Sequence, residues 1–210
     1  MLDNVVCLGH NSIKFLKESK VIYIDPYKIE DSYNDADIIF ITHNHYDHFS
    51  KEDILKVRKD TTKIVVTEDL YSDSISLGFS EQDIFKVLPG NNYVIDGINF
   101  STVASYNTNK DFHPKENGWV GYILILNNSS YYIVGDSDIT DEAKVVSCDV
   151  LFTPIGGTYT MNYEEAAEFT NIISPKVVVP VHYGVIVGEK DDAYKFKDLI
   201  DSSIVCEVMY

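Results

Sequence analysis

Three histidines and one aspartate lie within six positions of the segment ITHNHYDHFS, residues 41–50. They follow the order H-x-H-x-D-H and are His43, His45, Asp47 and His48. Alternate residues of an extended chain face one side, so the first three should point the same way, and the fourth should turn in as the chain bends. Imidazole and carboxylate suit zinc, manganese or iron. The absence of a neighbouring cysteine argues against a closed structural zinc site. The segment predicts most of an open, hydrolytic metal site.

The elements around this segment should place it at a sheet edge. The apolar run ADIIFI before it is typical of a strand buried on both faces, and Ser50 with Asp53 predicts a capped helix after it. The strand YYIVGD ends in Asp136, and the strand VVVPV is followed by His182. Carboxyl ends of strands in α/β sheets gather ligands, so both residues can join the site. His10 follows a glycine at a strand end and is expected to hydrogen-bond a ligand from below.

The motif THNHYDH resembles the signature of the metallo-β-lactamase-fold hydrolases, and Asp136 and His182 match the later landmarks of that superfamily. LGHNSIKFL and VIYIDP are similar to the opening of the subgroup with L-ascorbate-6-phosphate lactonases and the phospholipase D acting on N-acylphosphatidylethanolamines. The resemblance implies an α/β fold, a four-layer αβ/βα sandwich of two mixed sheets with helices outside. It also implies one or two divalent ions, zinc first and manganese or iron as alternatives. The implied ligands are His43, His45 and His113 for the first ion, Asp47, His48 and His182 for the second, and Asp136 between them.

The sequence departs from the superfamily pattern at one position. Much of the superfamily has another metal-binding histidine after the strand that corresponds to INFSTVAS, where this sequence has Asn107. An amide oxygen suits zinc poorly, and the only histidine available is His113, six residues later. Two interpretations stay open. Either His113 loops back to complete the first metal shell, or the site is depleted and His113 contacts substrate, with Lys115 available for an anionic group.

The function implied by the resemblance is that of a metal-dependent hydrolase. Bound metal ions lower the pKa of a water to about 7 and polarise the oxygen of the bond under attack. We expect Asp47 to act in catalysis by orienting the water and moving its proton, because a carboxylate beside a cation stays ionised. Expected substrates are small-molecule esters, lactones or phosphodiesters. The alternative is a non-catalytic metal-binding or metal-sensing protein on the same fold, which the missing middle histidine favours.

The composition fits one globular domain over residues 1–210, with 45% hydrophobic and 24% charged residues. A net charge of -16 repels polyanions, which makes nucleic acid a poor partner and a small-molecule substrate the expected one. No apolar run approaches a membrane span and no signal peptide is visible, so we expect no membrane partner and a cytoplasmic location. A homo-oligomer is expected on size alone.

Strands and helices are expected to alternate along the chain, with the three cysteines, Cys7, Cys148 and Cys206, as reduced packing residues in short apolar runs. Helices are expected at 51–59, 68–77, 162–173 and 191–200. Strands are expected at 5–9, 21–25, 37–42, 63–67, 84–88, 93–95, 98–105, 119–126, 131–136, 149–154, 176–181 and 204–209.

Overall fold

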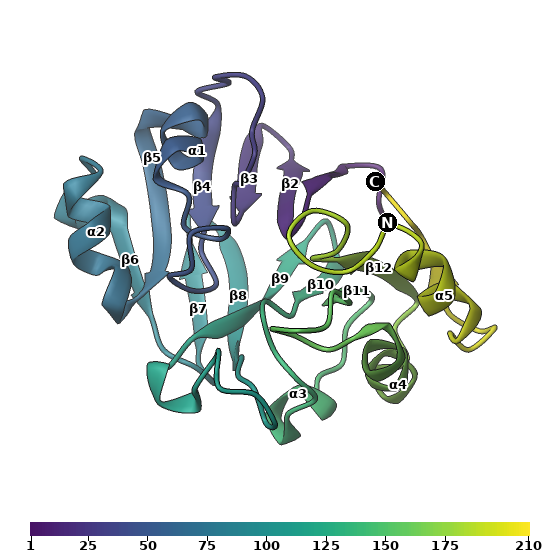
Figure 1. Ribbon diagram of the computed structural model, residues 1–210. Coiled ribbons are helices and arrows are strands. Elements are labelled where there is room, and N and C mark those ends of the chain that lie inside the picture. Colours follow the sequence, from purple (N-terminus) through teal and green to yellow (C-terminus); the bar gives the residue numbers. More distant parts are fainter. The chain divides into compact units, whose positions relative to one another are not determined.

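The structure is a computed structural model that describes residues 1–210. The chain divides into two compact units, residues 1–88 with Tyr210 and residues 89–209. Each unit contains one mixed β-sheet with helices packed on it (Figure 1). The predicted α/β class with two mixed sheets is therefore confirmed. The assignment of the whole chain to one domain stays a prediction.

The first unit contains a six-stranded sheet in the order β1-β2-β3-β4-β5-β6. β1 to β3 form antiparallel pairs, and β3 to β6 are parallel to one another. The parallel strands direct their carboxyl ends to one edge, which is where the histidine segment begins. The elements are β1 (Val5–Gly9), β2 (Ser12–Lys17), β3 (Lys20–Ile24), β4 (Ala36–Phe40), α1 (Lys51–Val57), β5 (Arg58–Thr67), η1 (Glu68–Leu70), α2 (Tyr71–Ser76), η2 (Glu81–Asp83) and β6 (Ile84–Val87).

The core of the first unit lies between its parallel strands and its helices. Ile39 and Ile64 of the central strands pack in one buried cluster with Ile54 of α1. β4 is buried on both faces, as its continuous apolar run predicted. Ser50 caps α1 by accepting from the backbone N–H of Asp53, so the helix begins where the sequence predicted.

The second unit contains a seven-stranded sheet in the order β13-β12-β11-β10-β9-β8-β7. β7 to β10 form antiparallel pairs, and β10 to β13 are parallel. The elements are β7 (Asn92–Ile95), β8 (Ile98–Ala104), η3 (Lys115–Asn117), β9 (Val120–Leu126), β10 (Ser129–Ile133), α3 (Asp141–Lys144), β11 (Val150–Pro154), α4 (Tyr163–Ile173), β12 (Val177–Val181), α5 (Asp192–Asp198) and β13 (Val205–Cys206).

The core of the second unit forms where α4 and α5 cover the parallel strands. Phe169 and Phe196 of these helices are fully buried in one cluster with Leu151 and Val178 of the strands. α4 begins with a capping box, in which the Asn162 side chain accepts from the backbone of Glu165 and the Glu165 carboxylate accepts from the backbone of Asn162.

Two expectations about local structure were wrong in detail. β2 was not expected as a separate strand, although it pairs with both of its neighbours. The extended conformation assumed for the histidine segment was also wrong, because β4 ends at Phe40 and the chain then turns. The backbone N–H groups of His48 and Phe49 both donate to the carbonyl of His45, at 3.0 and 2.8 Å. A tight turn, and not strand alternation, therefore presents Asp47 and His48.

The cysteines are free thiols inside the two units, as expected. Cys206 is buried, and Cys7 and Cys148 are half-buried. Burial raises the thiol pKa of Cys7 and Cys148 to about 12 and that of Cys206 to about 11, so all three thiols stay protonated at neutral pH. None of the helices has the length and apolar character needed to cross a membrane.

Candidate metal centre

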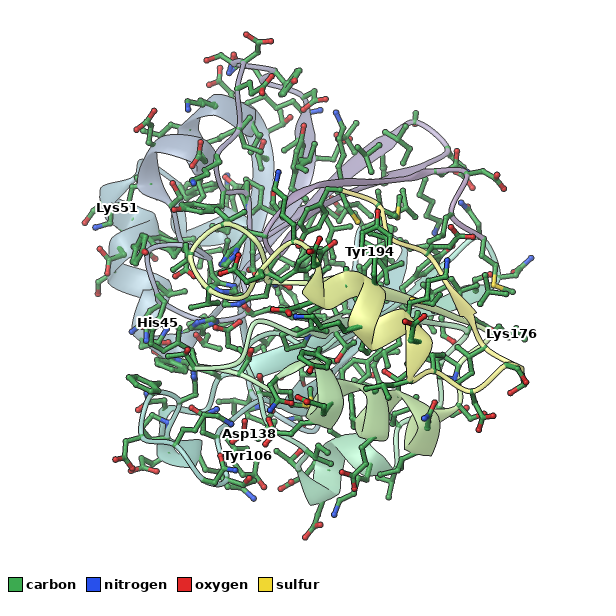
Figure 2. All side chains as sticks on the ribbon, turned by 45° about the vertical axis from the view of Figure 1, so that its right-hand side comes forward. His45, Lys51, Tyr106, Asp138, Lys176 and Tyr194 are labelled. Carbon is green, nitrogen blue, oxygen red and sulfur yellow. The ribbon has the colours of Figure 1, made fainter.

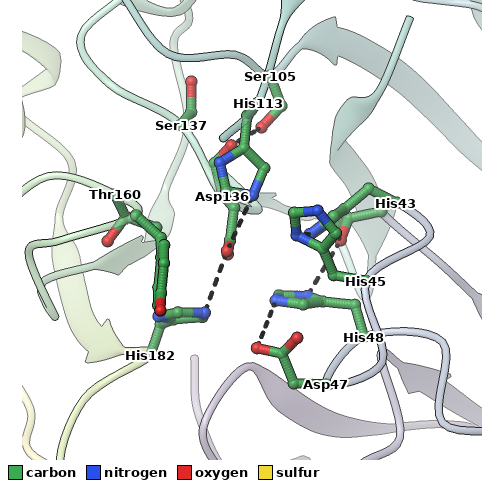
Figure 3. Close-up of polar contacts among 12 residues, drawn as sticks. His43, His45, Asp47, His48, Ser105, His113, Asp136, Ser137, Thr160 and His182 are labelled. Atoms are coloured by element: carbon green, nitrogen blue, oxygen red, sulfur yellow. Dashed lines mark hydrogen bonds and ion pairs between the residues drawn. The ribbon is translucent and has the colours of Figure 1, made fainter. Parts of the chain in front are cut away.

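The first unit brings the four motif side chains together beside β4. The Nε2 atom of His43 lies 3.1 Å from the Nδ1 atom of His45 (Figure 3). The Thr42 hydroxyl donates to Asp25, so it can only accept at its 3.0 Å contact with the Nδ1 atom of His43. The proton of His43 is therefore assigned to Nδ1, which makes Nε2 the lone-pair nitrogen that faces His45.

A buried carboxylate orients His48. Asp25 is fully buried and accepts from the backbone and hydroxyl of Thr42 and from the amide of Asn11, at 2.7 to 2.8 Å. Its Oδ2 atom also lies 2.7 Å from the Nδ1 atom of His48. A carboxylate on one ring nitrogen holds the proton there and makes the other, Nε2, the ligand atom. Sequence reasoning missed Asp25, although its place after a parallel strand next to β4 was a usable signal.

Asp47 lies between two imidazoles of the same unit. Its Oδ2 atom is 2.8 Å from the Nε2 atom of His10 and 3.6 Å from the Nε2 atom of His48. The ligand atoms of these three residues all lie within 4.8 Å of one another. His10 is buried in the turn between β1 and β2 with a positive φ of 55°. The hydrogen bond that we expected His10 to make to a candidate ligand is thus made to Asp47.

The second unit brings its three predicted ligands, His113, Asp136 and His182, close together. The Oδ2 atom of this carboxylate lies 3.3 Å from Nε2 of His113 and 3.1 Å from Nε2 of His182 (Figure 3). All three side chains are buried. Asp136 follows β10 and His182 follows β12, as the strand pattern predicted. The structure therefore places His113, whose role was left open, beside the predicted acidic ligand.

A close backbone approach holds His182 in position. Its φ is +57°, a left-handed conformation that is uncommon for a residue with a side chain. Gly156, after β11, passes so close that a Cβ atom there would lie 2.2 Å from the carbonyl oxygen of His182. This contact with the backbone of His182 therefore requires glycine at position 156.

Asn107 contacts His113 instead of taking the place of a metal ligand. Its Oδ1 atom accepts from the backbone N–H of His113 at 3.0 Å and lies 3.0 Å from the Nδ1 atom of the same residue. Its Nδ2 atom donates to the carbonyl of Tyr159 at 3.0 Å. The loop between the two residues is further closed by a bond from the Asn107 backbone N–H to the carbonyl of His113, at 2.8 Å.

The same loop is attached to the segment that carries Asp136. Tyr106 and Asp138 lie side by side (Figure 2), with a backbone bond of 3.0 Å from the N–H of Asp138 to the carbonyl of Tyr106. Lys110 forms a 2.5 Å ion pair with Asp138, which is buried. Lys115, in contrast, forms an ion pair of 2.5 Å with Glu142. This contact lowers the pKa of the Glu142 carboxyl to about 2, so Lys115 already has an anionic partner within the protein.

The donors in both units fit a divalent metal by their chemistry. Imidazole nitrogens and carboxylate oxygens are the ligands of zinc, manganese and iron, and the orienting bonds to His43, His48 and His113 are those that metal-binding histidines make. The first unit could supply four donors and the second three. All of these side chains except the half-buried His45 are buried, which is costly for imidazoles and carboxylates unless they bind partners or an ion.

Comparison with known proteins agrees with this chemistry. Residues 4–182 match the beta-lactamase superfamily domain. The UPF0173 metal-dependent hydrolase PYRAB05000 of Pyrococcus abyssi is 30% identical over 211 residues, which cover 92% of this chain and 90% of that protein.

Solved structures with lower identity share the fold. Igni18, a metallo hydrolase of Ignicoccus hospitalis, superposes with a TM-score of 0.79 at 23% identity, over 98% of this chain and 94% of that one. CmlA, a diiron beta-hydroxylase of Streptomyces venezuelae, superposes with a TM-score of 0.78 at 16% identity, over 98% of this chain and 52% of that one. The superfamily match and the relative from Pyrococcus together identify the chain as a member of the UPF0173 metal-dependent hydrolases in the beta-lactamase superfamily.

Proposed function

We propose that this protein is a hydrolase of small-molecule esters, lactones or phosphodiesters that works with one or two divalent metal ions. The observation that carries the proposal is the pairing of buried imidazoles with orienting oxygens, above all His48 with Asp25 and His113 with Asn107. Side chains that serve only in packing do not need a fixed ring tautomer. A metal ligand does, because its lone pair has to face the ion.

The proposed ligands keep the arrangement that the superfamily resemblance implies. His43, His45 and His113 would hold a first ion, Asp47, His48 and His182 would hold a second, and Asp136 would be available to both. Zinc is the proposed ion. Manganese and iron are the alternatives, since the donors suit all three and a diiron enzyme, CmlA, has the same fold.

In this proposal Asp47 is the catalytic carboxylate. Ions bound in such a site lower the pKa of a water to about 7 and polarise the substrate oxygen. Asp47 would accept a hydrogen bond and the proton from the attacking water, and His10, at 2.8 Å, holds the carboxylate in place. His10 can also relay the proton, because both of its ring nitrogens can carry one.

The substrate is proposed to be small and without strong polyanionic character. The net charge of -16 repels nucleic acids, and the ion pair of Lys115 with Glu142 occupies the lysine that could have bound a phosphate. The subgroup resemblance favours lactones and phosphodiesters among the three classes. A small-molecule partner, a cytoplasmic location and a homo-oligomer remain our proposals for its setting.

The test is metal analysis of the purified protein, followed by a screen of ester, lactone, thioester and phosphodiester substrates. Asp47→Ala should lose essentially all turnover of whichever class is hydrolysed, while retaining at least part of the metal. Asp60→Ala, a change at an exposed carboxylate of β5, is the matched control and should leave turnover unchanged. Turnover that survives in Asp47→Ala would contradict the role of Asp47. Bound metal without turnover of any class would favour the metal-binding or metal-sensing alternative.

A further inference from the structure

We propose that Asn107 is a positioning residue that fixes both the place and the ring tautomer of His113, so that this histidine takes over the role of the missing metal ligand. This inference rests on the proposed metal function. It answers the question that the sequence left open, because it gives Asn107 and His113 different tasks. Asn107 is not a metal ligand in a weakened site, and His113 is not a substrate contact.

The hydrogen bonds of Asn107 determine which of its side-chain atoms is the oxygen. One end of the amide faces the carbonyl oxygen of Tyr159 at 3.0 Å and must therefore be the N–H₂ donor. The other end, Oδ1, faces the backbone N–H of His113 at 3.0 Å and can only accept. A flipped amide would place two donors against one another at one end and two acceptors at the other.

This orientation assigns the proton of the His113 ring. The Nδ1 atom lies 3.0 Å from Oδ1 of Asn107, which is an acceptor, so Nδ1 carries the proton. Nε2 is then the nitrogen that would present a lone pair to a bound ion, and it lies 3.3 Å from the Asp136 carboxylate. The two lone pairs of Oδ1 are both engaged by N–H donors of His113. That leaves Asn107 with no acceptor position for a metal.

The loop that carries Asn107 is connected to the loop that carries Asp136. The Ser105 hydroxyl donates to the carbonyl of Asp136 at 3.0 Å, and the N–H of Tyr106 donates to the Ser137 hydroxyl at 3.1 Å. Trp119 contacts the other side of the His113 ring, edge to face, with 5.6 Å between the ring centroids. The imidazole is therefore held relative to the carboxylate by both polar and aromatic contacts, and Asn107 is the contact that sets its rotation and tautomer.

The experiment measures the tautomer directly, in metal-free protein labelled with ¹⁵N-histidine. Long-range ¹H–¹⁵N spectra at about pH 8, where an ordinary histidine is neutral, distinguish a protonated Nδ1 from a protonated Nε2. In the unmodified chain the His113 proton is expected on Nδ1. Asn107→Leu removes the acceptor, and a mixture of tautomers is expected. Asn109→Leu, an exposed position in the same loop, is the matched control and should leave the spectrum of His113 unchanged.

Asn107→Asp is the second variant, for use if Asn107→Leu does not fold, because it keeps the acceptor for His113 although the Tyr159 carbonyl loses its donor. The charged oxygen should strengthen the bond and move the Nδ1 proton resonance of His113 downfield. Titration with zinc adds a second readout, in which Asn107→Leu should bind one ion roughly 10- to 100-fold more weakly, the usual effect of losing an outer-sphere partner.

Three results would overturn the inference: a proton on Nε2 in the unmodified chain, an unchanged tautomer in Asn107→Leu, or an unshifted proton in Asn107→Asp. A protein that binds no metal at all would instead contradict the proposed function. The two failures are distinguishable because the tautomer is measured without metal.

Discussion

The two units supply their candidate ligands in contrasting ways. In the first, four ligands come from six consecutive residues, and one turn after β4 presents them. In the second, three candidate ligands come from three distant segments, and two of them have a positioning contact of their own, Asn107 for His113 and Gly156 for His182. The first cluster therefore has most of its geometry set by one turn and the contacts of Asp25 and His10, whereas the dispersed cluster needs separate contacts on several segments. The predictions below test this difference.

After the change at Asp47, the largest effect is expected from Asp136→Ala. This carboxylate lies within 3.3 Å of both histidines of the second unit, so its loss should weaken metal binding there. A loss of several kcal/mol of transition-state stabilisation lowers kcat/KM by about three orders of magnitude. Steady-state kinetics and metal content measure it, with the exposed Asp141→Ala of the same unit as control. A fall of less than tenfold would show that the second cluster is not needed.

A smaller effect is expected from Asp25→Asn in the first unit. The amide has one acceptor oxygen where the carboxylate had two, and its N–H₂ group would face a donor, so His48 loses its fixed tautomer. The expected loss of metal affinity is roughly 10- to 100-fold, as for other outer-sphere partners. Isothermal titration with zinc is the measurement, and Asp60→Asn should bind zinc like the unmodified chain. Unchanged affinity in Asp25→Asn would mean that the turn positions His48 alone.

Gly156→Ala should affect stability and the site together. Its Cβ atom would meet the carbonyl oxygen of His182 at 2.2 Å, so the backbone has to shift, at an expected cost of about 1–3 kcal/mol in the free energy of unfolding. Gly121→Ala is the matched control, with a backbone oxygen at 2.6 Å. Chemical denaturation should show a loss in both variants, and zinc titration of the folded proteins should show weaker binding only in Gly156→Ala. Equal zinc binding by the two variants would show that Gly156 does not position His182.

The smallest effect is expected at Asp149, which stabilises the second unit away from the cluster. Bonds from Lys176 and Ser130 lower the pKa of this carboxyl to about 2, below its ordinary value near 4. Its contribution to stability is therefore present above pH 4 and is lost as the pH falls toward 2. Asp149→Asn should be less stable than the unmodified chain at pH 7 by less than about 1 kcal/mol, as for other surface ion pairs, and the difference should shrink at acid pH. Denaturation curves at both pH values measure it, and a difference that grows at acid pH would contradict the assignment.

The sequence predicted the local motif of the first unit better than the dispersed cluster of the second. The run ADIIFI and the capping pair Ser50 and Asp53 were enough to place the motif at a strand end, because burial and capping are local signals. The turn at His45 was not predicted, since no glycine or proline marks it. Asp25 was not identified as an orienting residue because its partner His48 lies on another segment, and Asn107 was not identified because the spacing does not show that its loop closes on His113. Only folding reveals which of many polar residues meets a given imidazole.

The contrast between the two interpretations of His113 illustrates the same limit. Spacing alone left a metal ligand and a substrate contact equally open. The fold decides the geometry through contacts with Asn107, Trp119 and Asp136, which are separated from His113 by 6 to 23 positions in the chain. In a dispersed site, the roles of the residues therefore follow from the hydrogen bonds that they make in the folded chain.

The central claim is that His113 binds a metal ion in place of the missing histidine. An anomalous-difference map, from crystals grown with zinc and measured at the zinc edge, tests it most directly. We predict a peak at binding distance, about 2.0–2.1 Å, from the Nε2 atom of His113, with Asp136 as a further ligand of the same ion. A map whose zinc peaks have neither His113 nor Asp136 as a ligand, or a peak bound by the oxygen of Asn107, would contradict the claim.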